Sequence, residues 1–177
     1  MLCLKEVLKL DGKLLNEARA LRYLIDAVED LMAAEVLLDK EVYNLVLFHC
    51  QQASEKSSKA CLSLFGIILA DEHKYAGFLQ KMVVPNSGRL RNKFTQLMVK
   101  VSVLENLYII SRYGVDKEGR IHLREFEKED VDDAFNAATD FTELCFLFLE
   151  EKLNAKLPRK KDLLVAHLKA NYKELIK

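Results

Sequence analysis

The chain contains few residues that break helices. Its 177 residues include six glycines and two prolines, and neither type occurs in residues 13–65 or 120–157. In a helix interior glycine costs about 1 kcal/mol relative to alanine, and proline costs about 3 kcal/mol. No segment shows the alternating apolar and polar pattern of a half-buried strand. The two uninterrupted runs therefore predict long helices.

The chain also lacks net charge and any long apolar run. It carries 27 basic and 27 acidic side chains, so no overall field attracts nucleic acid, and any such contact has to be local. No window approaches the ~20 apolar residues of a membrane span. Residues 1–13 alternate leucine with lysine and glutamate, unlike the apolar centre of a signal peptide. These features predict a cytoplasmic protein without membrane contact.

The four cysteines form no pattern typical of metal or redox sites. No C-x-x-C pair is present, and no two histidines stand four residues apart on a predicted helix. We therefore expect neither a metal nor another cofactor. Cys50 and Cys61 are eleven residues apart, which returns to nearly the same face of a helix. Because free cysteine commonly behaves as a small buried hydrophobe, both are predicted to lie in the core.

Apolar residues at spacings of three and four predict four long helices, over residues 16–38, 41–66, 90–113 and about 130–153. Asp130 is expected to cap the first free amides of the fourth helix, near whose positive end Asp132 and Asp133 also lie. Shorter helices are predicted near residues 75–83, over 159–176 and at 2–10. The predicted fold is all-α, an antiparallel up-and-down helical bundle. It forms one domain over 1–177, with a core of 16–153 and a C-terminal extension of 159–177.

Two of the predicted helices have faces that suggest packing partners. The first is expected to bury one stripe, made of Leu21, Ile25, Val28 and Met32. The second carries small residues at the centre of its core stripe, which allow another helix to approach closely. Its opposite face holds Leu45, Phe48 and Leu62 among polar residues, so we expect that face to be covered as well.

A more specific pattern occurs in the second and third long helices. Residues 48–60 read Phe-His-x-Gln-Gln-Ala-x-Glu-Lys-x-x-Lys-Ala, and residues 111–113 read Ser-Arg-Tyr. Over roughly residues 16–153 the chain resembles the HEPN family, small helical-bundle proteins of prokaryotes. That family includes metal-independent ribonucleases, inactive binding modules and substrate-binding partners of nucleotidyltransferases. The resemblance thus implies the fold and leaves three kinds of function open.

Arg112 is the first candidate functional residue. It follows Tyr108 by four residues and Val101 by eleven, which places it on the core-facing stripe in the last turn before Gly114. A guanidinium in that position can be paired inside the protein, with a helix C-terminal carbonyl or with Glu55. It can also hold a phosphate through two parallel hydrogen bonds. The family resemblance favours the second role.

The remaining candidate ligand-binding residues are Tyr113 and a set on the second helix, namely His49, Gln52, Lys56 and Lys59. These side chains could line a groove for a phosphate or a base. Gln52 has an alternative role, a hydrogen bond across a helix contact, because an amide on a partly apolar face is costly unless it is paired.

Ribonuclease members of the family use an arginine followed, after four to six residues, by a histidine that transfers the proton. Here nine residues separate Arg112 from His122, and the residue after the arginine is Tyr113 rather than a short polar one. A long loop seldom holds a proton donor to the ~0.5 Å that catalysis requires. Cleavage by Arg112 and His122 therefore remains the alternative prediction.

The sequence and the resemblance together predict a non-catalytic module that binds a nucleotide, an RNA or another substrate. By resemblance, it acts with a separate minimal nucleotidyltransferase in a pair like those of toxins and antitoxins. The resemblance and the face with Leu45, Phe48 and Leu62 also predict a homodimer. The alternative is a metal-independent HEPN ribonuclease, acting as a toxin or in defence.

Overall fold

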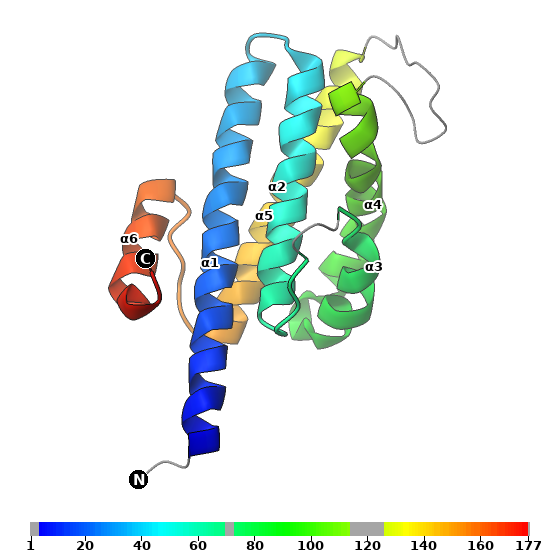
Figure 1. The fold of residues 1–177 in the computed structure, drawn as a ribbon. Coiled ribbons are helices and arrows are strands. Elements are labelled where there is room, and N and C mark those ends of the chain that lie inside the picture. The colour runs from blue at the N-terminus through cyan, green and yellow to red at the C-terminus, as the bar shows by residue number, and fades with distance from the viewer. Residues whose placement is uncertain (1–3, 70–72, 114–125, 177) are drawn as a thin grey trace.

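The structure is a computed structural model that describes residues 4–69, 73–113 and 126–176. Its α-helices are α1 (Leu4–Leu38), α2 (Tyr43–Ser63), α3 (Ala76–Phe78), α4 (Arg91–Tyr113), α5 (Lys128–Leu153) and α6 (Lys161–Asn171). Single π and 3-10 turns cover Leu79–Val83, Val84–Asn86, Gly88–Leu90 and Lys173–Leu175. The described residues contain no strand. Helices α1, α2, α4 and α5 run alternately up and down (Figure 1), which confirms the predicted all-α bundle.

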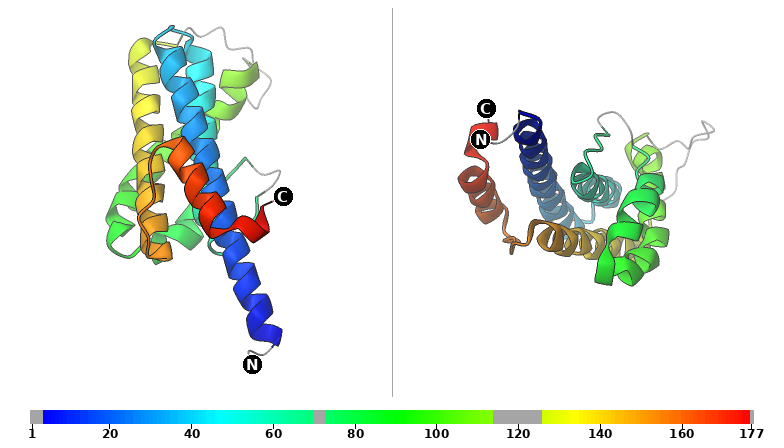
Figure 2. Two further views of the ribbon diagram at one scale, coloured as in Figure 1. Left: turned by 90° about the vertical axis from the view of Figure 1, so that its left-hand side faces the viewer. Right: turned by 90° about the horizontal axis from the view of Figure 1, so that it is seen from below.

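Two predicted helix starts are wrong. No separate helix covers residues 2–10, because α1 runs without a break from Leu4 through Gly12. One glycine costs only about 1 kcal/mol, which is too little to end a long helix. The first turns of α1 project beyond the bundle (Figure 2, left). Helix α5 begins at Lys128 after an extended Glu127, so Asp130 lies in its first turn and does not cap it. There its charge complements the positive helix end.

The lower half of the bundle holds the larger apolar core. Helices α1, α2, α4, α5 and α6 all contribute to it, together with the segment around Tyr75. At its centre Phe94 meets Phe141 and Phe148 edge-on, with ring centroids 6.3 Å and 5.7 Å apart. Edge-to-face pairs of this kind add about 0.5–1.5 kcal/mol beyond the area they bury. Helices α4 and α5 are therefore fixed to one another at this end.

The upper half holds a smaller core made mainly of short side chains. Its buried members are Ala34, Val46, Leu47, Cys50, Leu104, Val131, Ala137 and Ala138. Cys50, Cys61 and Cys145 are buried and reduced, which confirms the prediction for the first two. Burial raises the pKa of the Cys50 thiol to about 12, with a smaller contribution from the nearby Asp30 carboxylate. The Cys50 thiol is therefore protonated and inert at neutral pH.

Two residues lie on faces other than those predicted. Met32 is 52% exposed, whereas Leu24 and Ala27, which are outside the predicted stripe, are fully buried. The core-facing stripe of α1 is therefore rotated from the predicted one, although Leu21 of that stripe is buried as expected. Ile25 is buried because α6 packs against that side of α1. Helix α6 begins at Lys161, which binds Glu29, and Met32 lies almost one turn further along α1. Leu62 was expected on the second, outer face of α2. It is fully buried, because the chain that follows α2 folds back over it.

Helix α6 packs against the outside of α1, away from α4 (Figure 2, right), and buries Leu164 and Leu168. Lys161 at its start binds Glu29 of α1. Arg159, just before it, donates to both carboxylate oxygens of Glu143 at 2.8 and 2.7 Å. The predicted C-terminal helix over 159–176 is thus confirmed in a shorter form, Lys161–Asn171, followed by the 3-10 turn Lys173–Leu175. No helix among the described residues is long and apolar enough to span a membrane.

Candidate functional site

Helix α2 carries two groups of charged side chains on different sides, each arranged around one carboxylate. The first, which we call the Asp30 cluster, consists of Asp30, His49 and Lys56 and joins α2 to α1. The second, which we call the Glu55 cluster, consists of Gln51, Glu55, Lys59 and His73. It joins α2 to the segment that precedes α3. Together the two clusters contain three of the four α2 residues predicted to bind a ligand.

The Asp30 cluster is partly open to solvent. One carboxylate oxygen of Asp30 lies 2.9 Å from His49 Nδ1, and the other accepts a hydrogen bond of 2.5 Å from Lys56 Nζ. The side chains of His49 and Lys56 are 25% and 29% exposed, while that of Asp30 is 10% exposed. Both oxygens of the carboxylate are therefore engaged, with the two α2 side chains forming the outer layer.

The Glu55 cluster is more deeply buried. Lys59 Nζ donates to one oxygen of Glu55 at 2.8 Å, and Gln51 Nε2 donates to the other at 3.0 Å. His73 Nδ1 lies 3.1 Å from that second oxygen. Burial raises the pKa of the Glu55 carboxyl, but the bonds from Lys59, Gln51 and His73 together hold the pKa below its ordinary value. Glu55 is therefore ionised at neutral pH and acts as an acceptor.

Helix α4 is tied to the same region through Glu105. One carboxylate oxygen of Glu105 accepts hydrogen bonds of 2.7 Å from the backbone N–H groups of both Tyr75 and Ala76. These amides are at the start of α3, where a helix has free donors, so the carboxylate acts as a cap supplied by another helix. The Tyr75 side chain is fully buried beneath it. Its hydroxyl and that of Ser54 make no hydrogen bond within the described residues.

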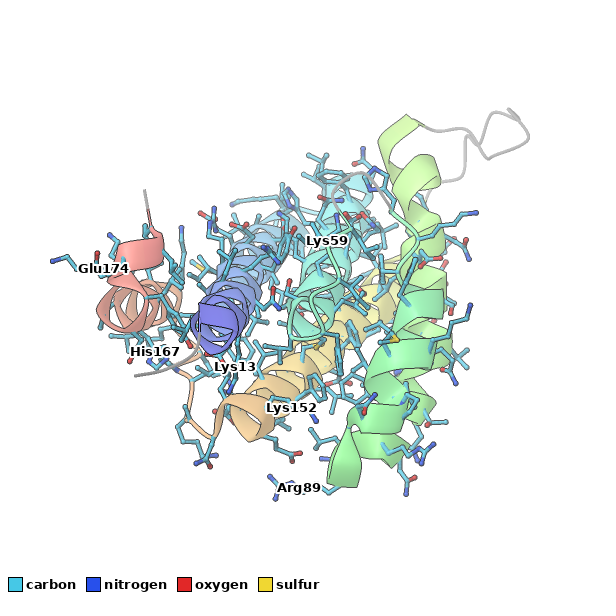
Figure 3. All side chains as sticks on the ribbon, turned by 60° about the horizontal axis from the view of Figure 1, so that its bottom comes forward. Lys13, Lys59, Arg89, Lys152, His167 and Glu174 are labelled. Carbon is cyan, nitrogen blue, oxygen red and sulfur yellow. The ribbon has the colours of Figure 1, made fainter. Side chains whose placement is uncertain are left out.

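The predicted α2 residues are all in contact with groups of the chain itself. His49 and Lys56 belong to the Asp30 cluster, and Lys59 belongs to the Glu55 cluster. Gln52 donates at 2.7 Å to its neighbour Gln51, within α2, rather than across a helix contact as the sequence suggested. Lys59 lies on α2, on the other side of α1 from His167 of α6 (Figure 3). The role of the four α2 residues in binding a ligand stays a prediction.

Arg112 and Tyr113 form the last turn of α4, and their side chains lie outside the described residues, as does all of His122. This end of α4 lies at the top of the bundle (Figure 1), and in the turned view it stands on the other side of α1 and α2 from the start of α5 (Figure 2, left). Arg112 follows Glu105 by seven residues, which is about 10 Å along a helix. Arg112 therefore lies well above the point on α4 where Glu105 accepts hydrogen bonds from the Tyr75 and Ala76 amides.

The sequence interpretation missed Asp30, His73, Tyr75 and Glu105. One signal for Asp30 was available, because it stands between Ala27 and Ala34 on the side of α1 that faces α2. A carboxylate in such a position requires a cationic partner on the neighbouring helix. His73 and Tyr75 carried no local signal, since their partners Glu55 and Glu105 come from distant parts of the chain. Among the described residues no group of three or more His, Cys, Asp or Glu could hold a metal ion.

The arrangement of α1, α2, α4 and α5 can be compared with known proteins. The family model of the HEPN domain matches residues 20–152, from within α1 to the end of α5. The chain belongs to the HEPN family. A relative from Methanocaldococcus jannaschii, named "Putative toxin MJ1304", is 32% identical over 134 residues, which is 73% of this chain and 88% of that protein. No solved structure matches. The first turns of α1 and all of α6 lie outside the family match.

Proposed function

We propose that this chain is the HEPN component of a toxin–antitoxin-like pair, a module that binds a nucleotide or a partner and does not cleave RNA. Its partner in this proposal is a separate minimal nucleotidyltransferase. Two comparisons support the proposal: the HEPN match over four helices of the bundle, and the relative that is named a toxin.

The placement of the described histidines is the observation that favours binding over cleavage. Metal-free cleavage of RNA requires a proton-transfer group within hydrogen-bond reach of the reacting atoms, beside the group that stabilises their charge. His49 is held by Asp30 of α1, and His73 lies against Glu55, while His167 belongs to α6. None of these three is at the end of α4. A proton donor beside Arg112 would have to come from His122, nine residues away across the following segment.

In this proposal Arg112 and Tyr113 bind the ligand. An arginine in the last turn of a helix is favoured by the negative end of the helix dipole. Its guanidinium can at the same time present two parallel N–H groups to a phosphate. Tyr113 adds an aromatic face on which a base can stack. The lysines of α2 are secondary candidates, because Lys56 and Lys59 already pair with Asp30 and Glu55.

Calorimetric titration with ATP as the probe tests this assignment. Arg112→Ala should weaken binding about 10- to 100-fold, because hydrogen bonds to a charged group contribute about 1.5–3 kcal/mol. His122→Ala should bind as the wild type does. Lys93→Ala, which removes an exposed charge near the other end of α4, is the matched control. Equal binding by the wild type and Arg112→Ala, or no binding by the wild type, would contradict the nucleotide-binding role.

Affinity purification of the tagged protein from its native host tests the partner. Mass spectrometry should identify a nucleotidyltransferase in about equal amount and a bound nucleotide with it. Recovery of the chain without any nucleotidyltransferase would contradict this part of the proposal.

We also propose that the module acts as a homodimer, but the α2 face first considered is a weak basis for it. Leu62 of that face is fully buried in the core, and Phe48 is half-buried. Leu45 alone among the three is exposed, at 41%. One exposed leucine is an ordinary surface feature, so a dimer requires another face.

A further inference from the structure

An apolar groove runs between α4 and α5 in the upper half of the bundle. Its volume is about 370 Å³, and its floor is formed by Leu47 of α2 together with Leu104 and Ala137. Further lining residues include Phe126 and Ala134 on the α5 side. The groove is bordered on the α4 side by Val99 and Val103. Each of these two valines is unusual for its exposure.

Val99 is 73% exposed, the largest value among the exposed large hydrophobic side chains of the described residues, and Val103 is 57% exposed. Because they are four residues apart on α4, they stand one above the other and form a short apolar ridge. The ridge and the groove therefore lie side by side on one surface. Exposed apolar side chains that adjoin an apolar groove form a candidate interaction surface.

The charges of the two helices are opposite. Helix α4 carries four basic and one acidic side chain, whereas α5 carries two basic and eight acidic ones. At the groove itself Lys100 lies on the α4 wall and Asp133 on the α5 wall. A basic helix with an apolar ridge would thus be complementary to the groove beside α5. Helix α4 of a second copy of this chain has both properties.

We propose that the α4–α5 surface is where two copies of this chain pair, with the Val99–Val103 ridge of each copy in the groove of the other. This inference rests on the homodimer of the proposed function and identifies its interface. A twofold axis makes such an interface self-complementary, since the same ridge and groove are used twice. A partner that only filled the groove would leave the ridge exposed to water. A second copy covers both features and pairs Lys100 of one copy with Asp133 of the other.

The oligomeric state of Val103→Asp, measured by light scattering at tens of micromolar, tests the interface. The wild type should have twice the mass of one chain, which is 20.4 kDa. The variant should dissociate with a dissociation constant raised at least about 100-fold, because an unpaired carboxylate is strongly disfavoured in an apolar interface. Val36→Asp is the matched control, since Val36 is also an exposed valine, 62% exposed, but lies on α1. It should remain a dimer.

Charge exchange provides a second variant that does not depend on apolar packing. Lys100→Glu and Asp133→Lys should each weaken self-association, and an equimolar mixture of the two should form a heterodimer. Circular dichroism of every variant must match that of the wild type. A Val103→Asp protein that remains dimeric would overturn this interface and leave the proposed dimer intact. A monomeric wild type would overturn both, whereas the ATP titration tests the binding function separately.

Discussion

The Asp30 and Glu55 clusters each combine a carboxylate, a lysine of α2 and a histidine, but their lysines differ in burial. In each, a carboxylate pairs with a lysine of α2 and lies beside a histidine. Lys56 is 29% exposed in the first cluster, whereas Lys59 is 9% exposed in the second. The histidines do not follow this order, since His73 is 45% and His49 is 25% exposed. Water can therefore replace a lost lysine more readily in the first cluster than in the second. The comparison therefore teaches that burial, and not the identity of the pair, decides how much each cluster contributes to stability.

The largest expected effect is that of Lys59→Ala. It leaves the Glu55 carboxylate buried without its cation, which should lower the free energy of unfolding by about 3–5 kcal/mol. Urea denaturation followed by circular dichroism measures the loss. The double variant Lys59→Met with Glu55→Gln is the control, because it removes both charges and should lose much less. A loss below about 1 kcal/mol for Lys59→Ala would mean that water reaches the Glu55 carboxylate. It would contradict the claim that burial makes this pair the more important one for stability.

Acid should affect the Glu55 cluster through the pKa of its carboxyl. That pKa is lowered in the folded protein, so the stabilisation is complete above the unfolded-state pKa of Glu and is lost as the pH falls through the folded-state value. The difference in unfolding free energy between the wild type and Glu55→Gln should therefore shrink as the pH falls from about 6 to 3. Denaturation curves at each pH give this difference. A difference that grows toward low pH would contradict the assigned direction.

Lys56→Ala should have a small effect. The side chain is partly exposed, and Asp30 keeps its contact with His49, so the loss should not exceed about 1 kcal/mol. The same urea experiment measures it beside Lys59→Ala. Salt should reduce the effect further, since ions screen exposed charges more than buried ones. Equal losses for Lys56→Ala and Lys59→Ala would show that burial does not distinguish the clusters.

The smallest expected effect is that of Tyr75→Phe. The Tyr75 hydroxyl is buried near Ser54 and Gln51 but forms no hydrogen bond of good geometry among the described residues, so its removal should cost little. The unfolding free energy should stay within about 0.5 kcal/mol of the wild type or increase. A loss above about 1.5 kcal/mol would mean that the hydroxyl is hydrogen-bonded in solution.

Local sequence signals predicted the helices but not every face they bury. The long helices followed from runs without glycine or proline. Helix α1 begins at Leu4, upstream of the predicted start at residue 16, because it continues through Gly12. Met32 and Leu62 were assigned to the wrong faces for one physical reason. Each is covered, or left uncovered, by a segment outside its own helix. Helix α6 begins beside Glu29 and does not reach Met32, and the chain after α2 folds back over Leu62. A periodic pattern within one helix does not contain that information.

The candidate site shows the same limit. The α2 residues were chosen from a pattern of the family, and their role in binding a ligand stays a prediction, whereas the partners they have within the chain were not predicted. Asp30 binds Lys56 across 26 residues, and Glu105 binds the amide of Tyr75 across 30. Such pairs depend on how the helices stack, which single-helix periodicity does not specify. Conversely, the HEPN pattern in α2 and the end of α4 identified the family before any contact was known.

Incubation of the purified protein with single-stranded RNA in excess chelator tests the central claim most directly. The wild type, Arg112→Ala and His122→Ala should all leave the RNA intact on a denaturing gel, because a binding module lacks a proton donor placed at the arginine. Cleavage by the wild type that is lost in both variants would contradict the account and show that the chain is a metal-independent ribonuclease.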